Sequence, residues 1–217
     1  MANPNRPKTI LCLGASNTIC TYFLIIGQPE ALPWPTYLRM LASGIGPGWT
    51  VVNGGVNSAT VFDVHKVAPT VPCEQLFGVP LLHSTRPDIV ILVVESNDAQ
   101  YGPDHASTPA KVVAGIKHFE QLVYAHPTAS GTRPLFFTTY TNLAGAFYHT
   151  PLSLTASGFT HDFNTLLPTL VSSGQCIDFA TGLAADNLYI DELHYVASAQ
   201  LTRGWRAYEK LLPYLTS

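Results

Sequence analysis

The 217-residue chain is rich in hydrophobic residues, which make up 47% of it, and poor in charged residues, which make up 12%. An average soluble domain has roughly 25% charged residues, so much of this surface must be built from uncharged polar residues, and it could include the subunit interface of a homo-oligomer. The net charge of −3 and the lack of any cluster of Lys and Arg in the sequence leave no electrostatic footprint for nucleic acid or an anionic membrane, and we exclude both as partners.

No linker or break in composition divides the chain, which predicts a single domain over residues 1–217. The N-terminal segment MANPNRPKT is polar and leads at once into the apolar ILCLG, which is too short for a signal peptide or a membrane span. We therefore expect a cytoplasmic protein. The cysteines lack any C-x-x-C spacing, which favours reduced thiols over disulfides or zinc ligands. They are Cys12, Cys20, Cys73 and Cys176.

Five short apolar runs predict strands, at residues 9–13, 50–52, 88–94, 135–139 and 176–179. Because the runs are continuous rather than alternating, we expect strands that are buried on both faces, as in a parallel sheet covered by helices. Helix-compatible stretches alternate with them, at residues 35–43, 73–84, 109–125, 160–172 and 197–215. This order predicts an α/β fold, a three-layer α/β/α sandwich around a five-stranded parallel sheet. Ligands of such folds bind beyond the carboxyl ends of the strands, so the residues that follow each run are the candidates for a site.

The segment Gly14-Ala15-Ser16-Asn17-Thr18 follows the first predicted strand and leads into a predicted helix start. A serine at this point has its hydroxyl at the edge of the sheet and its backbone N–H near a helix N-terminus, where negative charge is favoured. Ser16 could therefore be a nucleophile. Judged on this fragment alone, a helix N-cap is the more common role for such a serine.

Turns that follow the second and third predicted strands hold two candidate donors to an oxyanion. Paired glycines let a backbone N–H approach a ligand closely, so Gly55 could be one donor. Asn97, in Glu95-Ser96-Asn97-Asp98, could donate from its side-chain amide. Both segments are also typical of ordinary turns, and neither decides the matter by itself.

The segment Asp191-Glu192-Leu193-His194 precedes the last predicted helix. In a compact turn, the Asp191 carboxylate can accept a hydrogen bond from His194 Nδ1 and leave Nε2 available as a base. A D-x-x-H match arises by chance about 0.3 times in a chain of this composition, so the spacing alone proves little. The argument comes from the conjunction, because four such signals occur in order and each lies just beyond an apolar run.

These four blocks together resemble the SGNH hydrolases, also called the GDSL esterase/lipase family. They are Ser16 in LGASNT, Gly55 in VVNGGVNSAT, Asn97 in ESND and His194 in DELHYVASAQ. The resemblance implies a flavodoxin-like sandwich and a serine esterase that hydrolyses a small carboxylic ester or transfers its acyl group. It implies Ser16 as nucleophile, His194 as general base and acid, and Asp191 as the residue that orients the imidazole. It further implies an oxyanion hole from the backbone N–H groups of Ser16 and Gly55 and the Asn97 side chain, with no metal or organic cofactor.

Three positions depart from the family pattern. Ala15 stands where the family has Asp, Glu95 where it has Gly, and Tyr195 where it usually has Pro. The paired loss and gain of a carboxylate suggests that Glu95 projects into the space of the missing side chain, where it could act as an acid or base. A Glu bonded to backbone amides as scaffolding explains the exchange equally well. Tyr195 could close part of the pocket with its ring, or could simply pack.

The substrate is weakly encoded. Seven aromatic residues in predicted loops could form an apolar wall for a hydrophobic ester, although such residues are more often core. They are Tyr22, Phe23, Trp34, Tyr140, Phe147, Tyr148 and Tyr195. The histidines other than His194 show no ligand spacing with cysteines or carboxylates, so we predict no metal site.

Two other functions fit the same fold. One is a non-hydrolytic biosynthetic reaction, such as a cyclisation or ring opening, in which Glu95 and His194 act as acid and base. The other is a binding module without catalysis, because two signature positions have changed. The intact Ser16, His194, Asp191 and Asn97 argue against that module.

Overall fold

The structure is a computed structural model that describes residues 7–19, 32–45, 48–56, 79–93, 109–125, 135–138, 163–167, 175–183 and 194–216. Its centre is one sheet of five strands, every neighbouring pair of which is parallel. The strands are β1 (Lys8–Leu13), β2 (Trp49–Asn53), β3 (Ile89–Leu92), β4 (Leu135–Thr138) and β5 (Cys176–Ile177). Their order across the sheet is β2-β1-β3-β4-β5, which is the flavodoxin-like order. The predicted five-stranded parallel sheet is confirmed.

Strand β1 lies in the interior of the sheet, between β2 and β3. Its last four residues have no exposed surface, which is why the sequence shows an unbroken apolar run there. Alternate side chains point to opposite faces. Ile10 and Cys12 belong to the core cluster under one helical layer, and Leu11 and Leu13 belong to the cluster under the other.

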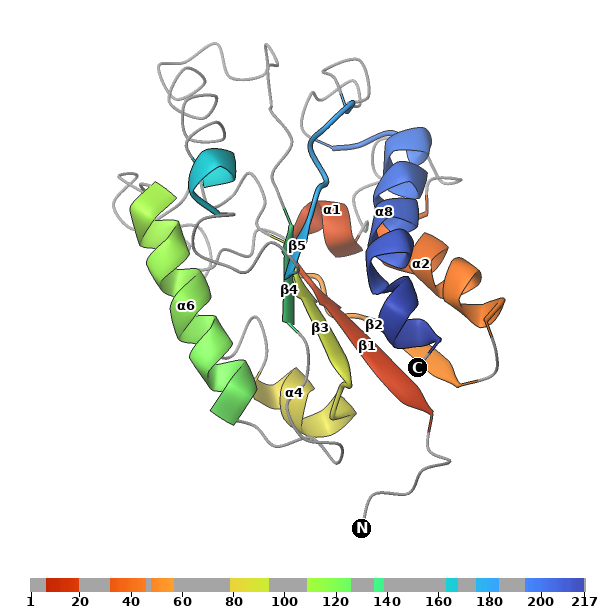
Figure 1. Ribbon diagram of the computed structural model, residues 1–217, viewed down its shortest axis with the longest axis horizontal. Coiled ribbons are helices and arrows are strands. Elements are labelled where there is room, and N and C mark those ends of the chain that lie inside the picture. Colours follow the sequence, from red (N-terminus) through yellow and green to blue (C-terminus); the bar gives the residue numbers. More distant parts are fainter. Residues whose placement is uncertain are drawn as a thin grey trace.

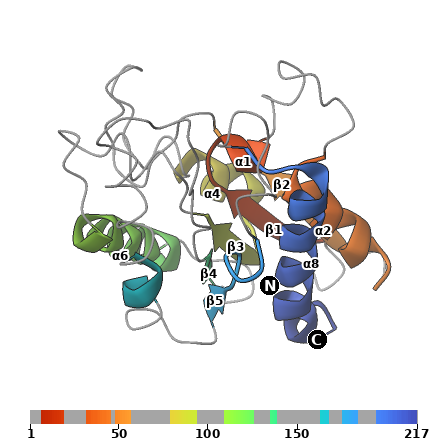
Figure 2. The ribbon, with the colours of Figure 1, turned by 90° about the horizontal axis from the view of Figure 1, so that it is seen from above.

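Helices cover both faces of the sheet (Figures 1 and 2). One layer is formed by α2 (Trp34–Ser43) and α8 (Ala197–Leu215), which also pack on each other. The other is formed by α4 (Val79–Thr85), α6 (Pro109–Ala125) and the helical residues 163–167. The three-layer α/β/α sandwich is therefore confirmed. A further short helix, α1 (Ser16–Ile19), begins three residues after the end of β1.

Several strand ends differ from the sequence prediction by one or two residues, and at two of them a carboxylate bonds to the backbone. Strand β5 ends at Ile177 because the Asp178 carboxylate accepts the backbone N–H groups of Ala180 at 2.8 Å and Thr181 at 3.0 Å, which turns the chain. Asp88 lies outside β3, and its carboxylate accepts the Thr9 N–H at 2.7 Å. Of the predicted helices 73–84 and 160–172, residues 73–78, 160–162 and 168–172 lie outside the described part of the chain.

Within the described ranges, no helix is both long enough and apolar enough to cross a lipid bilayer. The same ranges hold no group of three or more His, Cys, Asp or Glu side chains arranged to bind a metal ion. Cys12 is a buried free thiol and Cys176 a half-buried one, while Cys20 and Cys73 lie outside the described residues.

Candidate active site

Ser16 is the first residue of α1, directly beyond the carboxyl end of β1. The Ala15 carbonyl accepts the N–H groups of Thr18 and Ile19, both at 3.0 Å, so the chain reverses sharply at Ser16. The serine is 8% exposed and sits at the sheet edge where ligands of such folds bind. Ala15 is packed in the apolar cluster on the α6 side. Because its side chain is a methyl group, it brings no carboxylate to the site.

Gly55 lies against α1, beyond the carboxyl end of β2. The segment continues the sheet ladder, because the Gly54 N–H donates to the Cys12 carbonyl at 2.8 Å and the Val56 N–H to the Gly14 carbonyl at 2.9 Å. A Cβ atom at Gly55 would lie 2.6 Å from the Ile19 nitrogen. Only a glycine brings this backbone so close to the turn that carries Ser16.

Asn53 joins the two turns through its side chain. Its Nδ2 donates to the Thr18 carbonyl at 2.7 Å, and its Oδ1 accepts the Gly55 N–H at 3.0 Å. The backbone N–H that the sequence suggested as an oxyanion donor therefore already has a side-chain acceptor. For Gly55 to stabilise an oxyanion, this N–H must be shared between the two acceptors or move from Asn53 to the substrate.

His194 lies just before α8 and is 2% exposed, with its Nε2 atom shielded from water. The next residue, Tyr195, donates its backbone N–H to the Oδ1 of Asn17 at 3.0 Å. Asn17 directly follows Ser16, so this hydrogen bond joins the neighbours of the two residues over 178 positions of sequence. The turn of Ser16 and the turn of His194 thus lie together at the carboxyl edge of the sheet.

Gln200, on the first turns of α8, strengthens the same junction. Its Nε2 donates to the Asn17 carbonyl at 3.1 Å, and its Oε1 accepts the backbone N–H of Trp34 at 3.2 Å. The Trp34 indole in turn donates to the Thr18 hydroxyl at 3.3 Å. The helical layer of α2 and α8 is therefore fastened to α1 by buried hydrogen bonds.

Several predicted site residues lie outside the described ranges, namely Asp191, Asn97 and Glu95. Of the seven aromatic residues expected to line a pocket, Trp34 and Tyr195 are described and both are buried. The core interpretation is therefore the right one for these two. Trp34 packs edge to face on Phe179, with 5.3 Å between the ring centroids.

Sequence reasoning missed three polar residues whose hydrogen bonds hold the site together, and it also missed the buried Arg203. The three are Asn17, Asn53 and Gln200; a search for buried polar residues would have found Gln200 and Arg203. A signal for these two was present in the sequence. Gln200 and Arg203 fall on the stripe of α8 that otherwise holds Ala199, Ala207 and Leu211, so polar residues interrupt a buried face. Buried polar residues need partners, and the partners of Gln200 are in the site.

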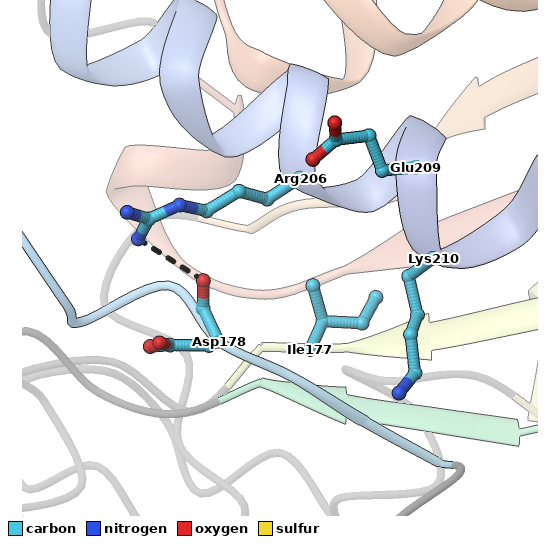
Figure 3. A pocket seen from close by; sticks show the side chains of 5 residues that line it. All are labelled: Ile177, Asp178, Arg206, Glu209 and Lys210. Atoms are coloured by element: carbon cyan, nitrogen blue, oxygen red, sulfur yellow. Dashed lines mark hydrogen bonds between the residues drawn. The ribbon is translucent and has the colours of Figure 1, made fainter.

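A surface hollow of about 310 Å³ lies between α8 and the segment of β5 (Figure 3). It is lined by Ile177, Asp178, Arg206, Glu209 and Lys210. Arg206 reaches from α8 to the Asp178 carbonyl, to which its Nη1 donates at 3.1 Å, and its Nη2 donates to the Thr181 carbonyl. Neither Ser16 nor His194, the predicted catalytic residues that the structure describes, lines this hollow.

Comparison with known proteins gives a match only at the level of structure. No family model matches the chain, and no curated protein matches its sequence. The aryl esterase of M. smegmatis superposes with a TM-score of 0.75 at 16% identity, covering 95% of this chain and 99% of that one. A carbohydrate acetylesterase from Sinorhizobium meliloti gives 0.72 at 16% identity with the same coverage. A protein assigned to the G-D-S-L family of lipolytic proteins, from Desulfitobacterium hafniense, gives 0.62 at 18% identity, covering 94% of this chain and 99% of that one.

The chain has the SGNH hydrolase fold. At these identities the likeness establishes the fold and leaves the activity to be argued from the site. Within the SGNH hydrolase fold, the structure brings Ser16, Gly55 and the turn of His194 to one edge of the sheet. This convergence is what a shared site requires.

Proposed function

We propose that this protein is a serine esterase in which Ser16 is the nucleophile, His194 the general base and acid, and Asp191 the residue that orients the imidazole. The observation that carries the proposal is the hydrogen bond from the Tyr195 N–H to Asn17 Oδ1, which couples the serine turn to the histidine turn. The blocks that resemble the SGNH hydrolases supply the residue types, and the fold supplies their common edge.

The proposed reaction is acyl transfer in two steps. His194 removes the hydroxyl proton of Ser16 while Oγ bonds to the ester carbonyl carbon, and the resulting oxyanion is held by the N–H groups of Ser16 and Gly55 and by Asn97. The intermediate collapses, the C–O bond to the alcohol breaks, and the alcohol leaves with the proton from His194. Water then attacks the acyl-enzyme with His194 as base, which releases the acid and restores Ser16.

The substrate that we propose is a small carboxylic ester. Two structural neighbours are an aryl esterase and a carbohydrate acetylesterase, which makes aryl and sugar acetates the first esters to test. The site residues proposed here need no metal or organic cofactor for this chemistry.

Labelling with a fluorophosphonate tests the proposal directly. We expect one phosphonyl group on Ser16, located by mass spectrometry of peptides, together with loss of p-nitrophenyl acetate turnover. Ser16→Ala should lower turnover by a factor on the order of 10⁴ or more, because the residues of a triad act as a unit. Labelling of another residue, or undiminished turnover in Ser16→Ala, would refute the assignment.

The biosynthetic alternative makes the opposite prediction at Glu95. It requires that Glu95→Gln loses activity while Ser16 forms no acyl-enzyme. The esterase proposal expects an acyl-enzyme on Ser16, and comparison of Glu95→Gln with Glu95→Gly then separates a chemical role of the carboxylate from scaffolding.

A further inference from the structure

Arg203 is a buried cation in the second turn of α8. Its side chain is 3% exposed, and its guanidinium carbon lies 4.7 Å from the ring centroid of Phe179 and 4.7 Å from that of Tyr195. In the part of the chain that the structure describes, its buried Nε and Nη1 atoms have no hydrogen-bond acceptor. Burial of a charge is unfavourable, and the two ring faces offset part of that cost.

Tyr195 links this cation to the candidate site. The tyrosine directly follows His194, its side chain is 4% exposed, and its backbone N–H donates to Asn17 Oδ1. The histidine turn is therefore held from two sides, by Asn17 on the backbone and by Arg203 on the ring. A proline, the residue that the SGNH hydrolases usually carry here, has neither the N–H nor a ring that could reach the guanidinium.

The geometry points to Arg203 as a positioning residue, whose guanidinium bridges the rings of Tyr195 and Phe179 and thereby fixes His194 relative to Ser16. This inference rests on the proposed function. A flat guanidinium can lie against two ring faces at once, whereas the compact ammonium of lysine cannot, so shape matters here as well as charge. Arg203 has no part in bond making; it acts through Tyr195.

The neighbouring Arg206 provides a matched control. It also extends from α8 to the segment after β5, where it donates to the Asp178 carbonyl (Figure 3). It donates to the Thr181 carbonyl as well. No contact joins it to Tyr195 among the contacts of the described residues. Arg206→Met therefore weakens the anchorage of the same segment without touching the histidine turn.

The test measures how fast Ser16 is phosphonylated, with the saturating rate and the apparent binding constant of a fluorophosphonate determined separately. We expect Arg203→Met to lower the saturating rate about ten- to a hundredfold, because small displacements of a catalytic base have effects of that size. Binding should change by less than about threefold, because no contact to the ligand is removed. Arg206→Met should keep the rate of the wild type.

Four further variants make the test specific. Arg203→Lys should remain as slow as Arg203→Met, and Tyr195→Phe should be faster than Tyr195→Leu because the ring is retained. Tyr195→Leu should be as slow as Arg203→Met. The double variant Arg203→Met/Tyr195→Leu should be no slower than either single variant, because both substitutions remove the same contact. All rates are taken well below the melting temperature of each variant. If Arg203→Met does not fold, the pair Tyr195→Phe and Tyr195→Leu decides the question.

Three results would overturn the inference while leaving the esterase intact. They are an unchanged rate in Arg203→Met, full recovery in Arg203→Lys, and additive losses in the double variant. A wild-type protein that is not labelled on Ser16 overturns the proposed function, and the role of Arg203 with it.

Discussion

At the scale of single residues, two asparagines connect turns that are distant in sequence. Asn17 bonds to the turn of His194 and to Gln200, and Asn53 bonds to α1 and to Gly55. Turns leave backbone donors and acceptors without partners inside their own segment, and a side-chain amide offers both kinds of atom. The site is thus held by short polar bridges between loops as well as by the apolar core beneath it.

The close approach at Gly55 gives the first prediction. Gly55→Ala places a Cβ atom 2.6 Å from the Ile19 backbone nitrogen, so α1 and Ser16 must shift. We expect a loss of about 1–3 kcal/mol in the free energy of unfolding, measured with urea, and a clear loss of aryl acetate turnover. Gly48→Ala is the control, because its Cβ meets nothing within 4 Å. Equal behaviour of the two variants would contradict the structure.

The hydrogen bond to Asn17 gives the second prediction. Asn17→Leu keeps a similar volume but leaves the buried Tyr195 N–H without its acceptor, which costs about 1–3 kcal/mol of stability. Turnover should fall as well, because the serine and histidine turns lose their link. Trp49→Phe is the comparison. It removes the hydrogen bond from Trp49 Nε1 to the Leu215 carbonyl, at the far end of α8, and should lower stability while leaving the kcat unchanged.

At the scale of elements, α8 determines where the histidine turn sits. It begins three residues after His194, and Gly204 lies close against α2. A Cβ on Gly204 would lie 2.7 Å from Tyr37 Cβ and 2.9 Å from the Trp34 carbonyl oxygen. The two helices are therefore packed backbone to backbone, on the same side of the sheet as the Gln200 junction.

This contact predicts that Gly204→Ala destabilises the protein although alanine favours helix. The helical preference is worth about 1 kcal/mol, while forced separation of packed helices costs about 1–3 kcal/mol, so the net change in the free energy of unfolding should be a loss. Gly44→Ala is the control. Gly44 has a φ of −73°, and its added Cβ would lie 3.4 Å from its nearest neighbour, so thermal unfolding should show no loss. A stabilised Gly204→Ala would show that the helices are more loosely packed.

The elements also show what the sequence could reveal. The apolar runs predicted the strands because parallel strands are buried on both faces, and α6 and α8 have the predicted bounds. Strand β5 was predicted too long because Asp178 bonds to its own following backbone, which is a local competition with the ladder. The hydrogen-bond partners of Asn17 and Gln200 could not be predicted, since they lie more than 160 positions away.

At the scale of the whole molecule, the sheet order places β1 where both of its edges and both of its faces are covered. Ser16 lies just beyond this strand, so the turn of the proposed nucleophile starts from an enclosed part of the fold. Among the described strands, β5 pairs with β4 alone and lies at the edge of the sheet. Interior strands of a sheet open only in large-scale unfolding, whereas edges can open locally.

Cys12 can serve as a reporter of that difference. Its side chain is fully buried on β1, and burial raises the pKa of its thiol well above the usual value. The thiolate is the reactive form, so iodoacetamide should modify Cys12 only when the sheet opens globally. The free energy from the labelling rate should then equal that from urea unfolding, whereas the half-buried Cys176 on β5 should react sooner.

The raised pKa of Cys12 also determines how the free energy of unfolding changes with pH. Below the pKa of the unfolded thiol, about 8.5, both states are protonated and the stability that Cys12 contributes is fully present. Above it, the unfolded state loses a proton that the folded state keeps, so stability falls by about 1.4 kcal/mol per pH unit until the folded thiol also ionises. Cys12→Ala should lose this slope, which urea unfolding at pH 8 to 10 measures against the wild type. An identical slope in the two proteins would mean that Cys12 is not shielded by the sheet.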